Sequence, residues 1–159
     1  MRILGIDPGT GILGFGIVET NGVKNPTFID AGVIRTPAGQ ADSQRLLTIY
    51  NELSEIVKQT KPSVIAVEKL FFAQNVTTAM SVSQARGVVL LVGEQNNLKL
   101  YEYTPLQIKQ SLTGYGRADK KQMQDMVRTI LGLSAVPKPD DAADALATAL
   151  CCATIISKW

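Results

Sequence analysis

Four acidic residues in this sequence have the type and spacing for metal chemistry. Asp7 ends the apolar stretch ILGID, and Glu68 ends the similar stretch VIAVE. Asp141 and Asp144 lie three residues apart, which places them on one face of a helix. Carboxylates that converge in a poorly solvated cleft repel one another unless a cation lies between them. Because the sequence has no histidine, the ligands would be oxygen atoms, which suit Mg²⁺ or Mn²⁺.

A site of this kind can hydrolyse a phosphodiester bond. Two divalent ions about 3.5–4 Å apart bind the attacking water and the leaving oxygen, and one of them lowers the pKa of the water. The absence of histidine excludes Ser-His-Asp and Cys-His catalysis. Hydrolysis must then rest on carboxylates, lysines, tyrosines or a hard metal ion held by oxygen.

Each acid also has a purely structural interpretation. Asp7 can start the Asp-Pro-Gly turn, and Glu68 can be a solvated strand end. Asp141 can be the N-cap of a helix, with Asp144 as the acid three residues later. Asp140 competes for the cap, and it also shares a helix face with Asp144, so it could replace Asp141 as a ligand.

Two groups of residues could hold a nucleic acid. Phe71 and Phe72 follow Glu68 closely, and an exposed ring beside a phosphate site can stack on an unpaired base. The alternative is that both rings cover the core. Residues 105–128 carry a surplus of three positive charges, which suits a polyanion or an ordinary solvated helix face. The cations of this segment are Lys109, Arg117, Lys120, Lys121 and Arg128.

The chain of 159 residues, with a net charge of +2, suits one domain, residues 1–159. The longest apolar runs are too short to cross a bilayer, so no membrane association is expected. The N-terminus has the pattern of a strand rather than a signal peptide, so we expect a cytoplasmic protein. Cys151 and Cys152 point about 100° apart on a helix and are expected to pack in the core.

The apolar periodicity predicts an α/β protein that can position the acids. Three strands joined by tight turns are predicted first, at residues 2–6, 12–19 and 27–35. Later strands are predicted at 61–68 and 99–103. Helices are predicted from a cap at Asp42 or Ser43 through Val57, and at 75–96, 105–113, 119–131 and 140–157. This order predicts a mixed sheet with helices on both faces. If the strands that end at Asp7 and Glu68 are adjacent and parallel, the two acids lie on the same rim of the sheet.

Five blocks of the sequence resemble one known family. They are GIDPGTGILGFGIVE, AVEKLFFAQN, QARGVVLL, QIKQSLTGYGRADKKQMQDMV and DDAADALATA. In the same order along the chain, they resemble the RuvC family of Holliday-junction resolvases. The resemblance covers nearly all of the sequence, and its VEKLFFAQN and DAADALA blocks are the most specific.

The resemblance implies a ribonuclease-H-like fold with five strands, a homodimer, and Mg²⁺-dependent paired nicking of four-way DNA junctions. By position, the catalytic and metal-binding acids of the family fall on Asp7, Glu68, Asp141 and Asp144. The aromatic that faces the junction falls on Phe71, and two lysines near the active site fall on Lys109 and Lys120. The RuvA–RuvB branch-migration complex is the implied partner. The apolar second half of helix 75–96 independently favours a partner helix.

The mechanism that follows is a hypothesis built on this resemblance. Asp7 bridges two Mg²⁺ ions, and the hydrolysis leaves a 5′ phosphate and a 3′ hydroxyl. Lys109 or Lys120 stabilises charge on the phosphate oxygens. Other functions remain open: a nucleotide-binding protein of the actin and sugar-kinase type, a junction-binding module without catalysis, and a nuclease of the same fold with another substrate.

Overall fold

A five-stranded mixed sheet forms the centre of the protein, which a computed structural model describes over residues 1–21, 26–69 and 76–156. The strands lie in the order β3-β2-β1-β4-β5. The first three are antiparallel, whereas β4 and β5 run parallel to β1, which confirms the predicted mixed sheet. The strands are β1 (Arg2–Asp7), β2 (Ile12–Glu19), β3 (Thr27–Arg35), β4 (Val64–Glu68) and β5 (Lys99–Tyr103).

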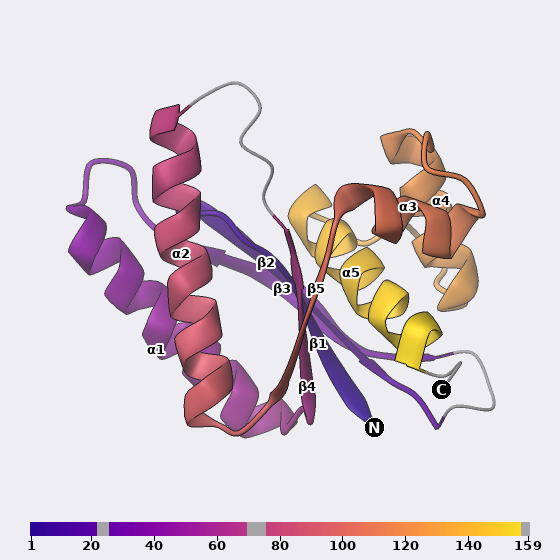
Figure 1. Ribbon diagram of the computed structural model, residues 1–159, viewed down its shortest axis with the longest axis horizontal. Coiled ribbons are helices and arrows are strands. Elements are labelled where there is room, and N and C mark those ends of the chain that lie inside the picture. Colours follow the sequence, from indigo (N-terminus) through magenta and orange to yellow (C-terminus); the bar gives the residue numbers. More distant parts are fainter. Residues whose placement is uncertain (22–25, 70–75, 157–159) are drawn as a thin grey trace.

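Helices cover both faces of this sheet, as Figure 1 shows. One face packs against α1 (Asp42–Thr60) and α2 (Val76–Gln95). The other face packs against α5 (Asp140–Ile156), which is flanked by α3 (Pro105–Thr113) and α4 (Lys120–Ile130). None of the helices in the described ranges is long and apolar enough to cross a membrane.

The alternation of side chains along β1 decides which layer its last residue faces. Leu4 and Ile6 are fully buried in the core beneath α1 and α2. Ile3 is buried in the other core, beneath α5. Because successive strand residues point to opposite faces, Asp7 points to the α5 side.

The close contact between α5 and the sheet depends on small residues. A β-carbon on Gly5 of β1 would overlap the backbone of Ala145, and one on Gly16 of β2 would overlap Leu146. Alanine is the commonest buried residue of this helix. Cys151 and Cys152 are buried and unbridged, which confirms that they pack in the core.

The predicted boundaries of α1 and β4 were wrong. The N-cap of α1 is Ala41 rather than Asp42 or Ser43, and its carbonyl accepts from the backbone N–H groups of Gln44 and Arg45. The strand predicted at 61–68 begins at Val64. Lys61 instead closes α1 in the left-handed conformation, with its N–H bonded to the carbonyl of Val57.

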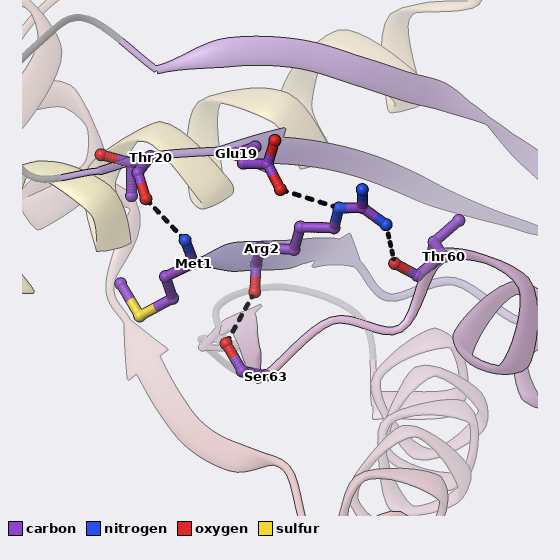
Figure 2. Close-up of polar contacts among 6 residues, drawn as sticks. All are labelled: Met1, Arg2, Glu19, Thr20, Thr60 and Ser63. Carbon is purple, nitrogen blue, oxygen red and sulfur yellow. Dashed lines mark hydrogen bonds and ion pairs between the residues drawn. The ribbon is translucent and has the colours of Figure 1, made fainter.

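Polar contacts fix the N-terminal end of β1, as Figure 2 shows. The Met1 ammonium donates to the Thr20 carbonyl at 2.7 Å. Arg2 donates from Nε to Glu19 at 3.0 Å and from Nη1 to the Thr60 carbonyl at 2.8 Å. These contacts tie β1 to β2 and to the end of α1. They lie at the end of β1 opposite Asp7.

Candidate active site

Asp7 and Glu68 end two adjacent parallel strands. Ile6 of β1 pairs with Val67 of β4, so the next residue along each strand is an acid. Val64 and Ala66 lie in the core beneath α5, so the alternation along β4 places Glu68 on that face too. Both acids therefore stand half-buried on one rim of the sheet, as predicted.

The first turn of α5 reaches the same rim. Gly14 pairs with Asp7 across β1 and β2, and it also lies directly against the backbone of Asp141. Asp144 follows three residues later on the same helix face. The helix begins at Asp140, so the interpretation of Asp141 as an N-cap is wrong. Asp141 lies inside the first turn.

The four carboxylates act on one another. The pKa of Asp7 is raised to about 8, first by burial and then by the charges of Glu68, Asp144 and Asp141. The positive charge of Lys120 opposes this rise. Asp7 is therefore the acid on which the charges of the other three all act.

Glu68 and Asp144 respond in the same way. Burial raises the pKa of Glu68, the charge of Asp144 raises it further, and Lys109 opposes the rise. Burial also raises the pKa of Asp144, against the effect of Lys120. A cluster of acids with raised pKa values is a common feature of catalytic sites and of metal sites.

Lys120 forms the ion pairs at the edge of the cluster. Its Nζ lies 2.9 Å from Asp140 Oδ2 and 3.7 Å from Asp144 Oδ2. Asp140 also accepts from Gln124 Nε2 at 3.1 Å, and Lys120 lowers the pKa of this exposed acid. Asp140 is not among the acids that raise the pKa of Asp7. This arrangement favours Asp141 over Asp140 as the inner acid.

A pocket of about 220 Å³ opens beside the acids. It brings two carboxylates and two ammonium groups together on a partly apolar wall. Its lining residues are Glu68, Asp144, Lys109, Lys120, Pro105, Ile108, Met123 and Ala147. A negatively charged phosphate could lie between the lysines while its ester bond faces the acids.

The other residues predicted to bind DNA lie on α4, in the connection before it, or outside the described residues. Arg117 is exposed in the connection between α3 and α4, and Lys121 is exposed in the first turn of α4. Arg128 lies farther along α4 and pairs with Asp125 at 3.9 Å. Phe71 and Phe72 lie outside the described residues.

The acid cluster fits a divalent cation by its chemistry. Within the ranges 1–21, 26–69 and 76–156, no three His, Cys, Asp or Glu side chains are already arranged to hold a metal ion. The repulsion that raises the pKa of Asp7 would nevertheless be removed by a divalent charge. The donors are carboxylate oxygens, which suit Mg²⁺ and Mn²⁺.

Sequence reasoning did not find two features that position the site. Gly14 has no side chain at the contact with Asp141, and glycines inside the strand ILGFGIVE were the available signal of a close backbone approach. The pairing of Lys120 with Asp140 had no signal, because it depends on how α4 packs beside α5.

The sheet order, the helices on both faces and the acids at adjacent strand ends define the class of ribonuclease-H-like nucleases. The family model described as "Crossover junction endodeoxyribonuclease RuvC" matches residues 3–152. A protein of that name from Desulfitobacterium hafniense is 57% identical over 152 residues, covering 95% of this chain and 91% of the relative. One from Caldicellulosiruptor saccharolyticus is 54% identical over 151 residues, with the same coverage.

A solved structure agrees with these relatives. Thermus thermophilus RuvC in complex with a Holliday junction substrate superposes with a TM-score of 0.94 at 35% identity, covering 99% of this chain and 96% of that one. The chain therefore belongs to the RuvC family.

Proposed function

We propose that this protein resolves four-way DNA junctions by placing paired, symmetric nicks in them. The observation that carries this proposal is the convergence of Asp7, Glu68, Asp141 and Asp144 on one rim beside a pocket with two lysines. Membership of the RuvC family supports junction DNA as the substrate, as does the likeness to a RuvC bound to a Holliday junction. Those comparisons favour catalysis over a module that only binds DNA.

The four acids are the proposed ligands of two Mg²⁺ ions, with Mn²⁺ as a possible substitute. When bound, the ions would lower the pKa of the attacking water and stabilise the leaving oxygen. Asp7 would be a central ligand, because the charges of the other three acids all act on it. Glu68, Asp141 and Asp144 would complete the ligand set.

The lysines would hold the phosphate that is cut. Lys109 and Lys120 line the pocket beside Glu68 and Asp144. Their ammonium groups can donate to the phosphate oxygens and stabilise the charge that develops there. Lys120 would then exchange its contacts with Asp140 and Asp144 for contacts with DNA.

Residues farther from the acids would hold the rest of the junction. Arg117 and Lys121 are exposed, and Lys121 directly follows the pocket residue Lys120 in the sequence. Both would bind backbone phosphates. Phe71 or Phe72 would stack on a base near the crossover, a proposal that rests on the sequence alone.

A homodimer would match the symmetry of the junction. Met80 and Leu91 of α2 are large apolar residues with 62% and 52% of their surface exposed. Gly87 lies between them in sequence, and a β-carbon there would meet open space. We propose that this face of α2 contacts a second copy, so that two active sites cut two strands. The proposed partner is RuvA–RuvB, and the proposed location is the cytoplasm.

The test is cleavage of an end-labelled four-way DNA junction beside a linear duplex of the same sequence, both with Mg²⁺. We expect symmetric nicks in the junction only. Asp7→Asn should lower nicking by more than about 100-fold, because losing a metal ligand costs at least as much as losing the hydrogen-bond partner of one. Junction binding without nicks would instead support a non-catalytic module.

A further inference from the structure

A second pocket, of about 450 Å³, lies beside the turn that follows Asp7, on the α1 and α2 side of the sheet. It shares no lining residue with the pocket beside the acids. Its walls come from the β1–β2 turn, from α1 and from α2, which cover the sheet face opposite α5. The lining residues are Gly9, Thr10, Gly11, Arg45, Thr78, Ser81 and Val82. None of them is acidic.

The turn at the base of this pocket is held firmly. The Thr36 hydroxyl donates to the Thr10 carbonyl at 2.6 Å, and the Thr36 N–H donates to the Gly11 carbonyl at 3.0 Å. The hydroxyls of Thr10 and Ser81 lie 2.6 Å apart, and the Thr10 hydroxyl also reaches the Ser81 carbonyl. The turn is therefore tied to β3 and to α2, and its position is fixed before any ligand arrives.

Arg45 supplies a positive charge whose position is also fixed. Its Nε donates to the Thr36 hydroxyl at 2.8 Å. Its Nη2 lies over Gly11, 3.1 Å from where a β-carbon would stand. The side chain is half-buried, and among the described residues it forms no ion pair with a carboxylate. The terminal nitrogens of its guanidinium group are thus left to bind an anion.

These features match a phosphate group. A guanidinium group presents parallel N–H donors that fit two phosphate oxygens. Gly9 and Gly11 line the pocket, so the backbone of the turn forms part of its wall. This turn follows Asp7 directly in the sequence, so the pocket residues Gly9–Gly11 are only two to four residues from one of the clustered acids.

We propose that this pocket binds one backbone phosphodiester of the DNA through Arg45. This phosphodiester would be the neighbour, on the same strand, of the one that is cut. This inference rests on the proposed function, because it takes the ligand to be DNA held over the acids. The site would read no base. It would fix the register of the strand relative to Asp7.

The test measures binding of the whole protein to a labelled four-way junction and to a linear duplex, in EDTA, over a range of salt concentrations. Arg45→Ala should weaken binding to both DNAs by roughly tenfold and reduce the log–log salt slope by about one, the signature of one lost phosphate contact. Lys58→Ala removes an exposed charge near the other end of α1 and should leave the slope unchanged.

A second pair of variants guards against a folding effect of Arg45→Ala. Thr78 is exposed in the first turns of α2, where an aspartate suits the helix dipole. Thr78→Asp adds a negative charge to the pocket and should weaken DNA binding, whereas Thr78→Asn, of nearly the same shape, should weaken it much less. Thermal unfolding of each variant checks that the fold is kept.

The outcomes separate this inference from the proposed function. If the wild-type protein nicks junctions but Arg45→Ala and Thr78→Asp both keep its affinity and salt slope, the phosphate site is wrong and the resolvase stands. If Arg45→Ala shows the expected reduction in salt slope on duplex DNA while the wild-type protein nicks no junction, the phosphate site is supported and the proposed resolvase activity is wrong.

Discussion

Gly14 lies directly against the backbone of Asp141, so closely that a β-carbon at position 14 would overlap the Asp141 carbonyl oxygen. Gly14 is also the cross-strand partner of Asp7. One missing side chain therefore sets the separation between Asp7 on β1 and Asp141 on α5. The distance between two proposed metal ligands is fixed by backbone packing rather than by side-chain contacts.

Gly14→Ala should consequently impair nicking as well as stability. The added methyl must displace the first turn of α5, which costs on the order of 1–3 kcal/mol and moves Asp141 from the rim. A displacement of a few tenths of an ångström at a ligand already disturbs a metal site. We expect junction nicking to fall by at least about tenfold, measured with the protein well below its melting temperature.

Gly39→Ala is the matched control for this experiment. Gly39 adopts a positive φ of 86° in an open loop, with nothing near its missing β-carbon. Alanine there costs ~1 kcal/mol through backbone strain alone. The control should lower the melting temperature by a few degrees and keep full nicking activity. Equal losses of nicking in both variants would show that Gly14 matters only for stability.

The strand ends could be predicted from the sequence because their pattern is local. ILGID and VIAVE each show an apolar run that stops at an acid, and the sheet places them side by side. The end of α1 at Lys61 was missed because the usual signal for a helix end is a glycine in the left-handed conformation, and here a lysine adopts that conformation.

The remaining features depend on contacts between distant segments. Arg45 meets Thr36 and the Gly9–Gly11 turn only because β3 and α1 pack beside that turn. Lys120 meets Asp140 only because α4 lies beside α5. No periodicity or local motif encodes such meetings, so charge counts alone could identify the basic segment but not its partners.

The raised pKa of Asp7 predicts how stability depends on pH when divalent ions are removed. Between its ordinary value of 3.8 and about 8, the folded protein binds a proton at Asp7 that the unfolded chain has released. Stability must therefore fall as pH rises through this window. Asp7→Asn removes the contribution of Asp7 to this dependence and should raise the melting temperature at pH 8 by a few degrees.

Thermal unfolding in EDTA between pH 5 and pH 9 checks this prediction. Mg²⁺ added at pH 8 should raise the melting temperature of the wild-type protein more than that of Asp7→Asn, because the ion binds the folded state through this carboxylate. The pH dependence would have the opposite sign if, in EDTA, the wild-type protein became more stable relative to Asp7→Asn as the pH rises. That result would place Asp7 outside the acid cluster.

The two neighbouring acids at the start of α5 should differ in function. Asp140 is exposed and bonded to Lys120 and Gln124, whereas Asp141 lies against Gly14 and acts on Asp7. Asp141→Asn should lower junction nicking by more than about 100-fold. Asp140→Asn is the matched control, with the same chemical change one residue away, and should change nicking by less than about threefold. The reverse ranking would make Asp140 the ligand beside Asp144.

The exposed face of α2 predicts the oligomeric state. Leu91 has 52% of its surface exposed on a helix that already packs its other side against α1 and the sheet. Burying it against a second copy would gain apolar contact, and a charge there would be left unpaired inside the interface. Leu91→Glu should therefore convert a dimer to a monomer, measured as the molar mass from light scattering.

Leu106→Glu is the control for this variant. It changes a leucine of similar exposure, 54%, on α3 and should leave the mass unchanged. A wild-type protein that is already a monomer at micromolar concentration would contradict the proposed dimer, and a Leu91→Glu protein that stays a dimer would move the interface away from α2.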